Sequence, residues 1–201
     1  MKNIIVDKCM NIIKNNNPKL SKKELDKMRY GLEGLYLNIT KVILVFIIAI
    51  ILGIFKETII LLLIFNGIRM TSFGVHAKRS IDCLVSSMIL FLGFPILCIH
   101  LTIPIIIKYI LFIPLVFLIG LLAPCDTEKR PLKDKKKRLV YKVLSIIISI
   151  IYMICAIFIK DNTLSNCFIF ALIIQIIVML PITYKIFGVS YNNYKKYEAT
   201  N

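Results

Sequence analysis

The sequence predicts an all-α, polytopic membrane protein with about six membrane segments. Two observations carry this prediction: 58% of the 201 residues are hydrophobic, and the mean hydropathy is +0.82. Soluble domains are nearer half apolar and seldom gather the excess in long runs. In this chain the excess of apolar residues falls in runs almost free of charge, at residues 42–55, 81–99, 103–123, 139–159 and 164–187. Three of these runs reach the roughly 20 residues that cross ~30 Å of hydrocarbon.

The first 40 residues are polar and basic, and they show no cleavable signal peptide. We expect two amphipathic helices here, lying on the cytoplasmic surface of the membrane. The first covers about residues 3–14 and is broken at Asn-Asn-Asn-Pro18. The second opens with a capping box, Ser21-Lys-Lys-Glu24, and is expected to continue into the first span.

The second apolar run is short, because only residues 58–65 are uninterrupted. As a helix these residues would rise only about 12 Å, which does not cross the membrane. Two solutions are open: Arg69 is drawn into the membrane boundary, or the segment is re-entrant. Irregular backbone at that depth requires burial in protein or a wet cavity, so this segment is a candidate part of a site.

The net charge of +15 is distributed in a way that indicates topology and not nucleic-acid binding. Segments 1–41, 66–80, 124–142 and 185–201 hold 23 of the 26 lysines and arginines, which places them and both termini in the cytoplasm. Lys56, Lys108 and Lys160 fall near the outer face. The predicted division is a membrane-surface region at 1–40, a transmembrane domain at 41–187 with a basic loop at 124–142, and a tail at 188–201.

The available chemistry is limited. No zinc-protease, phosphate-loop or dinucleotide motif occurs, and two histidines cannot make a three-histidine metal site, so we expect neither metal nor cofactor. The six cysteines show no paired spacing, and no structural disulfide is expected in a reducing cytoplasm. Cys125 falls in the basic loop, where we expect thiol reagents to reach it from the cytoplasm only.

His76 and Cys83 are the candidate base and nucleophile. In one straight helix they would share a face but lie about 10.5 Å apart along its axis, whereas a hydrogen-bonded pair needs about 3 Å. A catalytic pair therefore requires a break between them. Gly74 offers flexibility before the histidine, and Ser80 is a candidate N-cap that would make Cys83 the third residue of the next helix. The positive end of that helix favours a thiolate.

At these residues the chain resembles the AgrB-type (accessory gene regulator B) membrane cysteine endopeptidases, which process the pro-peptides of Gram-positive quorum-sensing signals. The resemblance covers most of the chain. It rests on Tyr30-Gly-Leu-Glu-Gly-Leu, Asn38-Ile-Thr-Lys41, Arg69-Met-Thr-Ser-Phe-Gly74-Val-His76 followed by Cys83, Ala123-Pro-Cys-Asp126 and Lys129-Arg-Pro-Leu132.

The resemblance implies that Cys83 is the nucleophile and His76 its base, with Arg69 and Gly74 at supporting positions. Phe73 departs from the pattern, because many relatives have a second glycine there. A third member of the catalytic set stays open. The candidates are Asn66, Asp82 and Asp126.

The resemblance also implies a partner: an AgrD-type pro-peptide with an amphipathic leader, a central signal peptide and an acidic tail. Candidate orienting or substrate-binding residues are Asp126, Lys129, Arg130, Lys135, Lys136 and Lys137. Membrane lipid is a further expected partner, and the family implies a homodimer. The expected reaction cleaves the tail through a Cys83 thioester and passes the acyl group to a substrate Cys or Ser, forming a cyclic thiolactone or lactone.

The alternative is a small peptide exporter or a membrane scaffold without catalysis. The spans hold almost no buried charge outside the polar inserts, which disfavours a transport path. Gln175 and Ser86-Ser87 are weak candidates for such a path.

Overall fold

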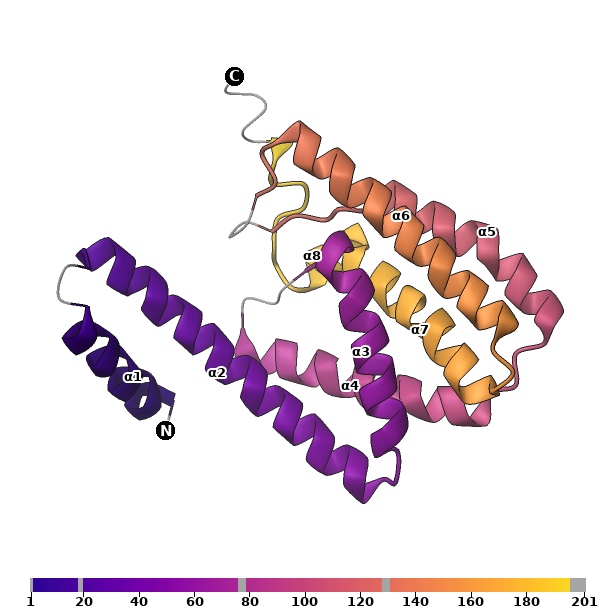
Figure 1. Ribbon diagram of the computed structural model, residues 1–201, viewed down its shortest axis with the longest axis horizontal. Helices are drawn as coiled ribbons and strands as arrows, with labels where there is room; N and C mark the ends of the chain where they lie inside the picture. Colours follow the sequence, from indigo (N-terminus) through magenta and orange to yellow (C-terminus); the bar gives the residue numbers. More distant parts are fainter. Residues whose placement is uncertain (1, 18–19, 76–78, 128–130, 196–201) are drawn as a thin grey trace. The chain divides into compact units, whose positions relative to one another are not determined.

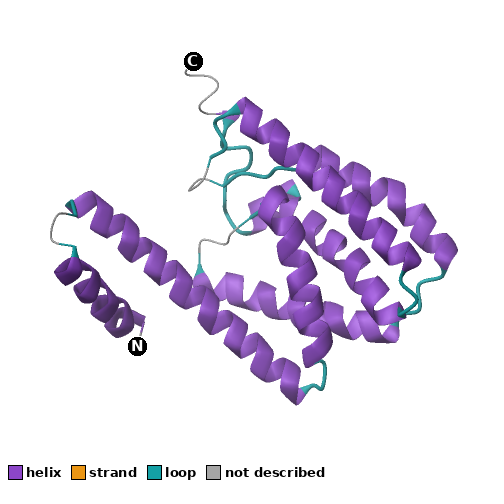
Figure 2. Ribbon diagram, viewed as in Figure 1, coloured by secondary structure: helices purple, strands orange, loops and turns teal. Residues whose placement is uncertain are grey.

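The computed structural model describes residues 2–17, 20–75, 79–127 and 131–195, and these residues form helices joined by short loops (Figure 2). The helices are α1 (Lys2–Asn16), α2 (Lys22–Ile51), α3 (Phe55–Ser72), α4 (Ser80–His100), α5 (Ile105–Leu122), α6 (Lys135–Phe158), α7 (Asn162–Met179) and α8 (Pro181–Ile186). The predicted all-α class is confirmed. Two compact units make up the chain, Met1–Ile47 and Ile48–Asn201.

In the first unit, α1 and the start of α2 confirm the two predicted N-terminal helices. The Ser21 backbone N–H and hydroxyl both donate to the Glu24 carboxylate, at 2.9 and 2.7 Å, which is the predicted capping box. A salt bridge of 2.7 Å joins Arg29 on α2 to Asp7 on α1. The position of these helices on a membrane surface stays a prediction.

Five helices in the described part of the chain are long and apolar enough to cross a membrane, namely α2, α4, α5, α6 and α7. The polytopic prediction agrees with this finding. The short second run lies on α3, which continues unbroken through residues 66–72. At 18 residues α3 is one continuous helix of roughly 27 Å, and it is not among these five candidate spans. Both solutions for Arg69 therefore stay predictions.

The second unit is built around α7, which packs against α3, α4, α5 and α6 (Figure 1). Its apolar stretch is 67% buried, against at most 22% for the other four candidate spans. The consecutive residues 169–172 are all buried, because the helix is apolar on every side and meets neighbours on every side. Contacts made by α7 therefore reach most of the bundle.

Lys108 corrects the expectation that the spans hold almost no buried charge. It lies on α5 and is 5% exposed. Its Nζ donates to the Ser165 hydroxyl at 2.6 Å and to the Ala156 carbonyl at 3.2 Å. Ala156 carries one of the last four carbonyls of α6, where a cation offsets the negative helix end. The buried amine is therefore explained by the packing of α5, α6 and α7 and does not indicate a transport path.

Candidate active site

The site begins at the last residue of α3 and the three non-helical residues that follow it, residues 72–75, here called the motif segment. The Phe73 N–H donates to the Arg69 carbonyl at 3.0 Å and closes α3. On one side, the Cys125 N–H donates to the Ser72 carbonyl at 2.9 Å and the Gly74 N–H to the Cys125 carbonyl at 3.2 Å. On the other side, the Val75 N–H donates to the Val178 carbonyl of α7 at 3.0 Å.

Arg69 fixes the end of the motif segment from within α3. Its Nη2 donates to the Val75 carbonyl at 2.8 Å. Its Nη1 is buried and has no hydrogen-bond partner among the described residues. The guanidinium lies close enough to Cys83 and Cys125 to interact electrostatically with both sulfurs. Arg69 thus joins the motif segment to a positive charge within reach of the predicted nucleophile.

Gly74 is required by both space and backbone conformation. Its φ is +128°, a region that L side chains rarely adopt. A Cβ at this position would lie 2.6 Å from Arg69 Nη1 and 3.0 Å from the Val178 carbonyl oxygen. Gly74, which the resemblance assigns to a supporting position, therefore lies where three chain segments cross closely.

Phe73 also adopts a glycine-like conformation, with φ 57° and ψ −138°. Such a backbone costs a residue with a Cβ about 1–3 kcal/mol and persists only when the surroundings hold it. Here the Phe73 carbonyl accepts a hydrogen bond from Gln175 Nε2 at 2.7 Å, and the ring packs edge-on against Tyr141 with centroids 5.0 Å apart. Phe73 therefore differs in its side chain from the second glycine of many relatives, but its backbone keeps a conformation that glycine favours.

Cys83 lies in the first turn of α4 and is half-buried. Residues 73–75 and Arg79 are not helical, so the predicted break before Cys83 is confirmed. The boundary differs by one residue: Arg79, with φ −92° and ψ 135°, is the N-cap in place of Ser80. Cys83 is consequently the fourth residue of the helix, and its N–H donates to the Arg79 carbonyl at 3.3 Å. The backbone N–H groups of Ile81 and Asp82 lie in the first turn, before the first intrahelical hydrogen bond of α4.

His76 lies outside the described residues, and so do Lys129 and Arg130. Their predicted roles stay predictions. The other predicted basic residues, Lys135, Lys136 and Lys137, are exposed on the first turn of α6. Asp134 caps that turn, accepting hydrogen bonds from the backbone N–H groups of Lys136 and Lys137.

Asp126 is 3% exposed and binds the tail. Its Oδ1 accepts from the Asn193 N–H at 2.8 Å and its Oδ2 from the Tyr194 N–H at 2.7 Å. Its carbonyl accepts from the Tyr184 hydroxyl at 3.1 Å. These contacts explain why an acidic residue lies just after the apolar run 103–123: it holds the chain that returns after α8.

Cys125 is 1% exposed, which corrects the expectation of a reagent-accessible loop cysteine. Its thiol donates to the Leu122 carbonyl at 3.1 Å and the Met179 carbonyl at 3.5 Å, and it lies 4.0 Å from the Tyr191 hydroxyl. Burial raises the pKa of the Cys125 thiol to about 11, although the Tyr191 hydroxyl opposes that rise. Cys125 is therefore a packing residue that stays protonated at neutral pH.

Sequence reasoning missed the two α7 contacts to the motif segment, from Gln175 and Val178. A signal existed for Gln175, because an amide in an apolar span requires a partner. That signal was compatible with a transport path and did not identify the Phe73 carbonyl. Val178 binds through its backbone, which leaves no trace in the sequence.

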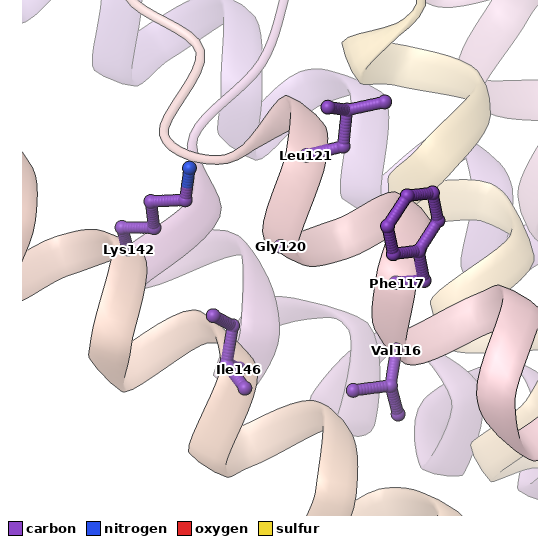
Figure 3. Close-up of a pocket in the computed structure, with 6 residues that line it drawn as sticks. All are labelled: Val116, Phe117, Gly120, Leu121, Lys142 and Ile146. Atoms are coloured by element: carbon purple, nitrogen blue, oxygen red, sulfur yellow. The ribbon is translucent and has the colours of Figure 1, made fainter.

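A hollow of about 390 Å³ lies between α5 and α6 (Figure 3). It is lined by Val116, Phe117, Gly120, Leu121, Lys142 and Ile146. Only Lys142 brings a charged group, and none of the predicted site residues lines it. We therefore place the candidate active site at the motif segment and the start of α4, and not in this hollow.

Comparison with known proteins gives one family. The sequence profile described as accessory gene regulator B matches residues 6–179. An AgrB-like protein of Clostridium acetobutylicum is 33% identical over 99% of this chain and 97% of its own length. An AgrB-like protein of Listeria monocytogenes is 31% identical, covering 86% and 84%. The accessory gene regulator protein B of Staphylococcus aureus is 34% identical, covering 78% and 82%. No solved structure matches the chain.

Proposed function

The chain belongs to the accessory gene regulator B family, and we propose that it is an integral-membrane cysteine endopeptidase that processes a quorum-sensing pro-peptide. Family membership supports a role in the accessory gene regulator quorum-sensing system. One structural observation supports the finer proposal most: the chain breaks between α3 and α4, directly after an anchored motif segment, and Cys83 lies in the first turn beyond the break. His76 directly follows the anchored Val75.

The proposed reaction has two acyl-transfer steps. His76 accepts the thiol proton of Cys83, and the thiolate attacks the carbonyl carbon that joins the signal peptide to its acidic tail. The S–C bond forms, the C–N bond breaks, and the proton passes from His76 to the leaving amine. A Cys or Ser of the signal peptide then attacks the thioester, which releases the Cys83 thiol and closes a thiolactone or lactone ring.

The charges available suit an acidic substrate tail. Lys135, Lys136 and Lys137 are exposed at the start of α6 and would attract carboxylates at the same membrane face. Arg69 supplies a buried positive charge within electrostatic reach of Cys83. We propose that the basic turn attracts the tail and that Arg69 orders the motif segment beside the nucleophile. A homodimer stays a prediction from the family.

The proposed topology places both termini and the start of α6 in the cytoplasm. Lys135 and Lys160 lie near opposite ends of α6 and are both exposed. Introduced as single cysteines in a chain whose six native cysteines are replaced by alanine, Lys135→Cys should react with an impermeant maleimide only after cells are opened. Lys160→Cys should react in intact cells. The reverse pattern would invert the topology.

Co-expression with a pro-peptide tests the proposed activity. The small reading frame beside the gene should encode an amphipathic leader, a Cys or Ser, and an acidic tail. Wild-type chain should shorten this peptide, whereas Cys83→Ala and His76→Ala should leave it intact. Cys155→Ala, which changes a half-buried thiol of α6, is the matched control and should keep cleaving. If Cys83→Ala still shortens the peptide, the chain is not a Cys83 endopeptidase, and an exporter or scaffold becomes the better account.

A further inference from the structure

Helix α7 carries two fully buried amides that do different things. Gln175 Nε2 donates to the Phe73 carbonyl at 2.7 Å. Asn166, nine residues earlier, donates from Nδ2 to the Cys98 and Leu101 carbonyls at 3.1 and 2.6 Å, at the far end of α4. In each amide the side-chain oxygen has no hydrogen-bond partner among the described residues. The two residues are therefore matched in burial and chemistry, and only Gln175 contacts the motif segment.

The Phe73 carbonyl needs a partner, because its peptide is held in an unfavourable orientation. A residue with a Cβ at φ 57° and ψ −138° gains by rotating toward negative φ, and that rotation would turn the carbonyl between Phe73 and Gly74. The Gln175 hydrogen bond opposes the rotation directly, since it binds that carbonyl. Gln175 is fully buried, so without this bond its amide donor would lose the partner that its burial requires.

The orientation of this peptide determines the path of the next residues. Gly74 crosses within contact distance of Arg69 and Val178, and Val75 is bonded through its N–H to Val178 and through its carbonyl to Arg69. A turn of the 73–74 peptide would shift this crossing, which has no spare room at Gly74. His76 follows Val75 without an intervening residue.

From these contacts we propose that Gln175 is a positioning residue for the Cys83 reaction. It acts through Phe73: its amide holds the strained peptide, and the held peptide sets the path of the motif segment up to Val75, the residue that precedes His76 in the sequence. This inference rests on the proposed function, because it assumes that His76 is the base of Cys83. It adds a side chain of α7 to a site that α7 otherwise contacts through the backbone carbonyl of Val178.

The test measures the Cys83 thiol directly, using iodoacetamide on the full chain in lipid vesicles, with the modified peptide quantified by mass spectrometry. His76→Ala gives the rate without the base. Gln175→Met keeps the length of the side chain but cannot donate, and it should slow alkylation of Cys83 about tenfold, because a base displaced by ~1 Å loses much of its effect. Asn166→Leu, the matched control, should leave that rate within about twofold of wild type, since it removes a buried amide away from the motif segment.

A second substitution separates positioning from general loss of stability. Phe73→Gly removes the backbone penalty, so the carbonyl no longer needs to be held. The double variant Phe73→Gly with Gln175→Met should therefore alkylate at about the rate of Phe73→Gly alone. If the double variant is as slow as Gln175→Met alone, Gln175 does not act through Phe73, and the inference is overturned.

The same measurements distinguish a failure of the Gln175 inference from a failure of the proposed function. If Gln175→Met and Asn166→Leu slow Cys83 equally, while His76→Ala slows it more, then Gln175 is only a packing residue and the inference fails alone. If His76→Ala leaves the rate of Cys83 unchanged, the His76–Cys83 pair itself is wrong. That result rejects the proposed function and the inference together.

Discussion

Arg69 and Val75 are joined by a hydrogen bond of 2.8 Å, from guanidinium Nη2 to backbone carbonyl, so a side chain of α3 binds the extended segment that leaves the same helix. The planar guanidinium also reaches the Gly74 crossing through Nη1 and stacks 5.8 Å from the Phe65 ring centroid. A lysine presents one compact ammonium and cannot keep this fork.

We therefore expect Arg69→Lys to lower pro-peptide cleavage about tenfold or more, because a charge-assisted hydrogen bond contributes about 1.5–3 kcal/mol. Product formed per amount of membrane-inserted chain is the measurement. Arg29→Lys, which alters an exposed salt bridge in the first unit, is the control and should cleave normally. Normal cleavage by Arg69→Lys would show that positive charge alone is sufficient at this position.

Gly74→Ala should abolish most of the activity. The added Cβ would lie 2.6 Å from Arg69 Nη1 on a backbone with φ +128°, so both the guanidinium and the backbone would have to move. Gly93→Ala on α4 is the matched control, since nothing lies within 4 Å of its Cβ position and alanine favours a helix. Equal activity of the two variants in the co-expression assay would mean that the crossing at Gly74 is not needed for the reaction.

Cys125 should make the fold less stable at alkaline pH. Its folded pKa is about 11, raised by burial, whereas an unfolded thiol ionises near about 8.5. Between these values the unfolded chain releases the proton and the folded chain keeps it. The stabilising effect is therefore complete below about pH 8.5 and is lost toward pH 11, at up to about 1.4 kcal/mol per pH unit.

Thermal unfolding of wild type and Cys125→Ala between pH 7.5 and 11 measures this effect. The Tm of wild type should fall more steeply, because the variant lacks the thiol. Parallel curves would contradict a buried, protonated thiol at this position.

Asp126→Asn should release the tail. Both carboxylate oxygens accept backbone N–H groups, from Asn193 and Tyr194, and an asparagine can offer only one acceptor oxygen to that pair. Loss of one charged hydrogen bond, about 1.5–3 kcal/mol, should raise local opening about tenfold or more.

Trypsin cleavage after Lys195 in reconstituted protein reports the opening of the tail. Asp134→Asn provides the comparison, because Asp134 also accepts two backbone N–H groups but does so at the exposed start of α6. If the two variants are cleaved at Lys195 at the same rate, Asp126 does not hold the tail.

The sequence was sufficient for features encoded over a few residues. Apolar runs predicted the long helices, the Ser21–Glu24 spacing predicted a capping box, and the spacing of His76 and Cys83 required a break that the chain has before α4. It was insufficient where burial depends on distant partners. The polar residues 66–71 resembled an interruption, yet they continue α3, and Arg69 binds the Val75 carbonyl beyond the end of the helix.

Cys125 and Lys108 show the same limit. Cys125 lies in a polar loop, but contacts from Met179 and Tyr191, more than fifty residues further along, enclose its thiol. Lys108 resembled a boundary residue, and the bonds that bury it come from Ala156 and Ser165. The partners of Cys125 and Lys108 could not be identified without knowing which helices pack together.

The dependence of the motif segment on α7 has a consequence for synthesis. Phe73 and Gln175 are 102 positions apart, and Gly74 and Val75 also take partners from Cys125 and Val178. A ribosome-bound chain carries both His76 and Cys83 long before it carries the helix that holds the segment between α3 and α4. Under the proposed function, the growing polypeptide would therefore be unable to cleave a peptide bond until α7, its last long helix, has joined the bundle.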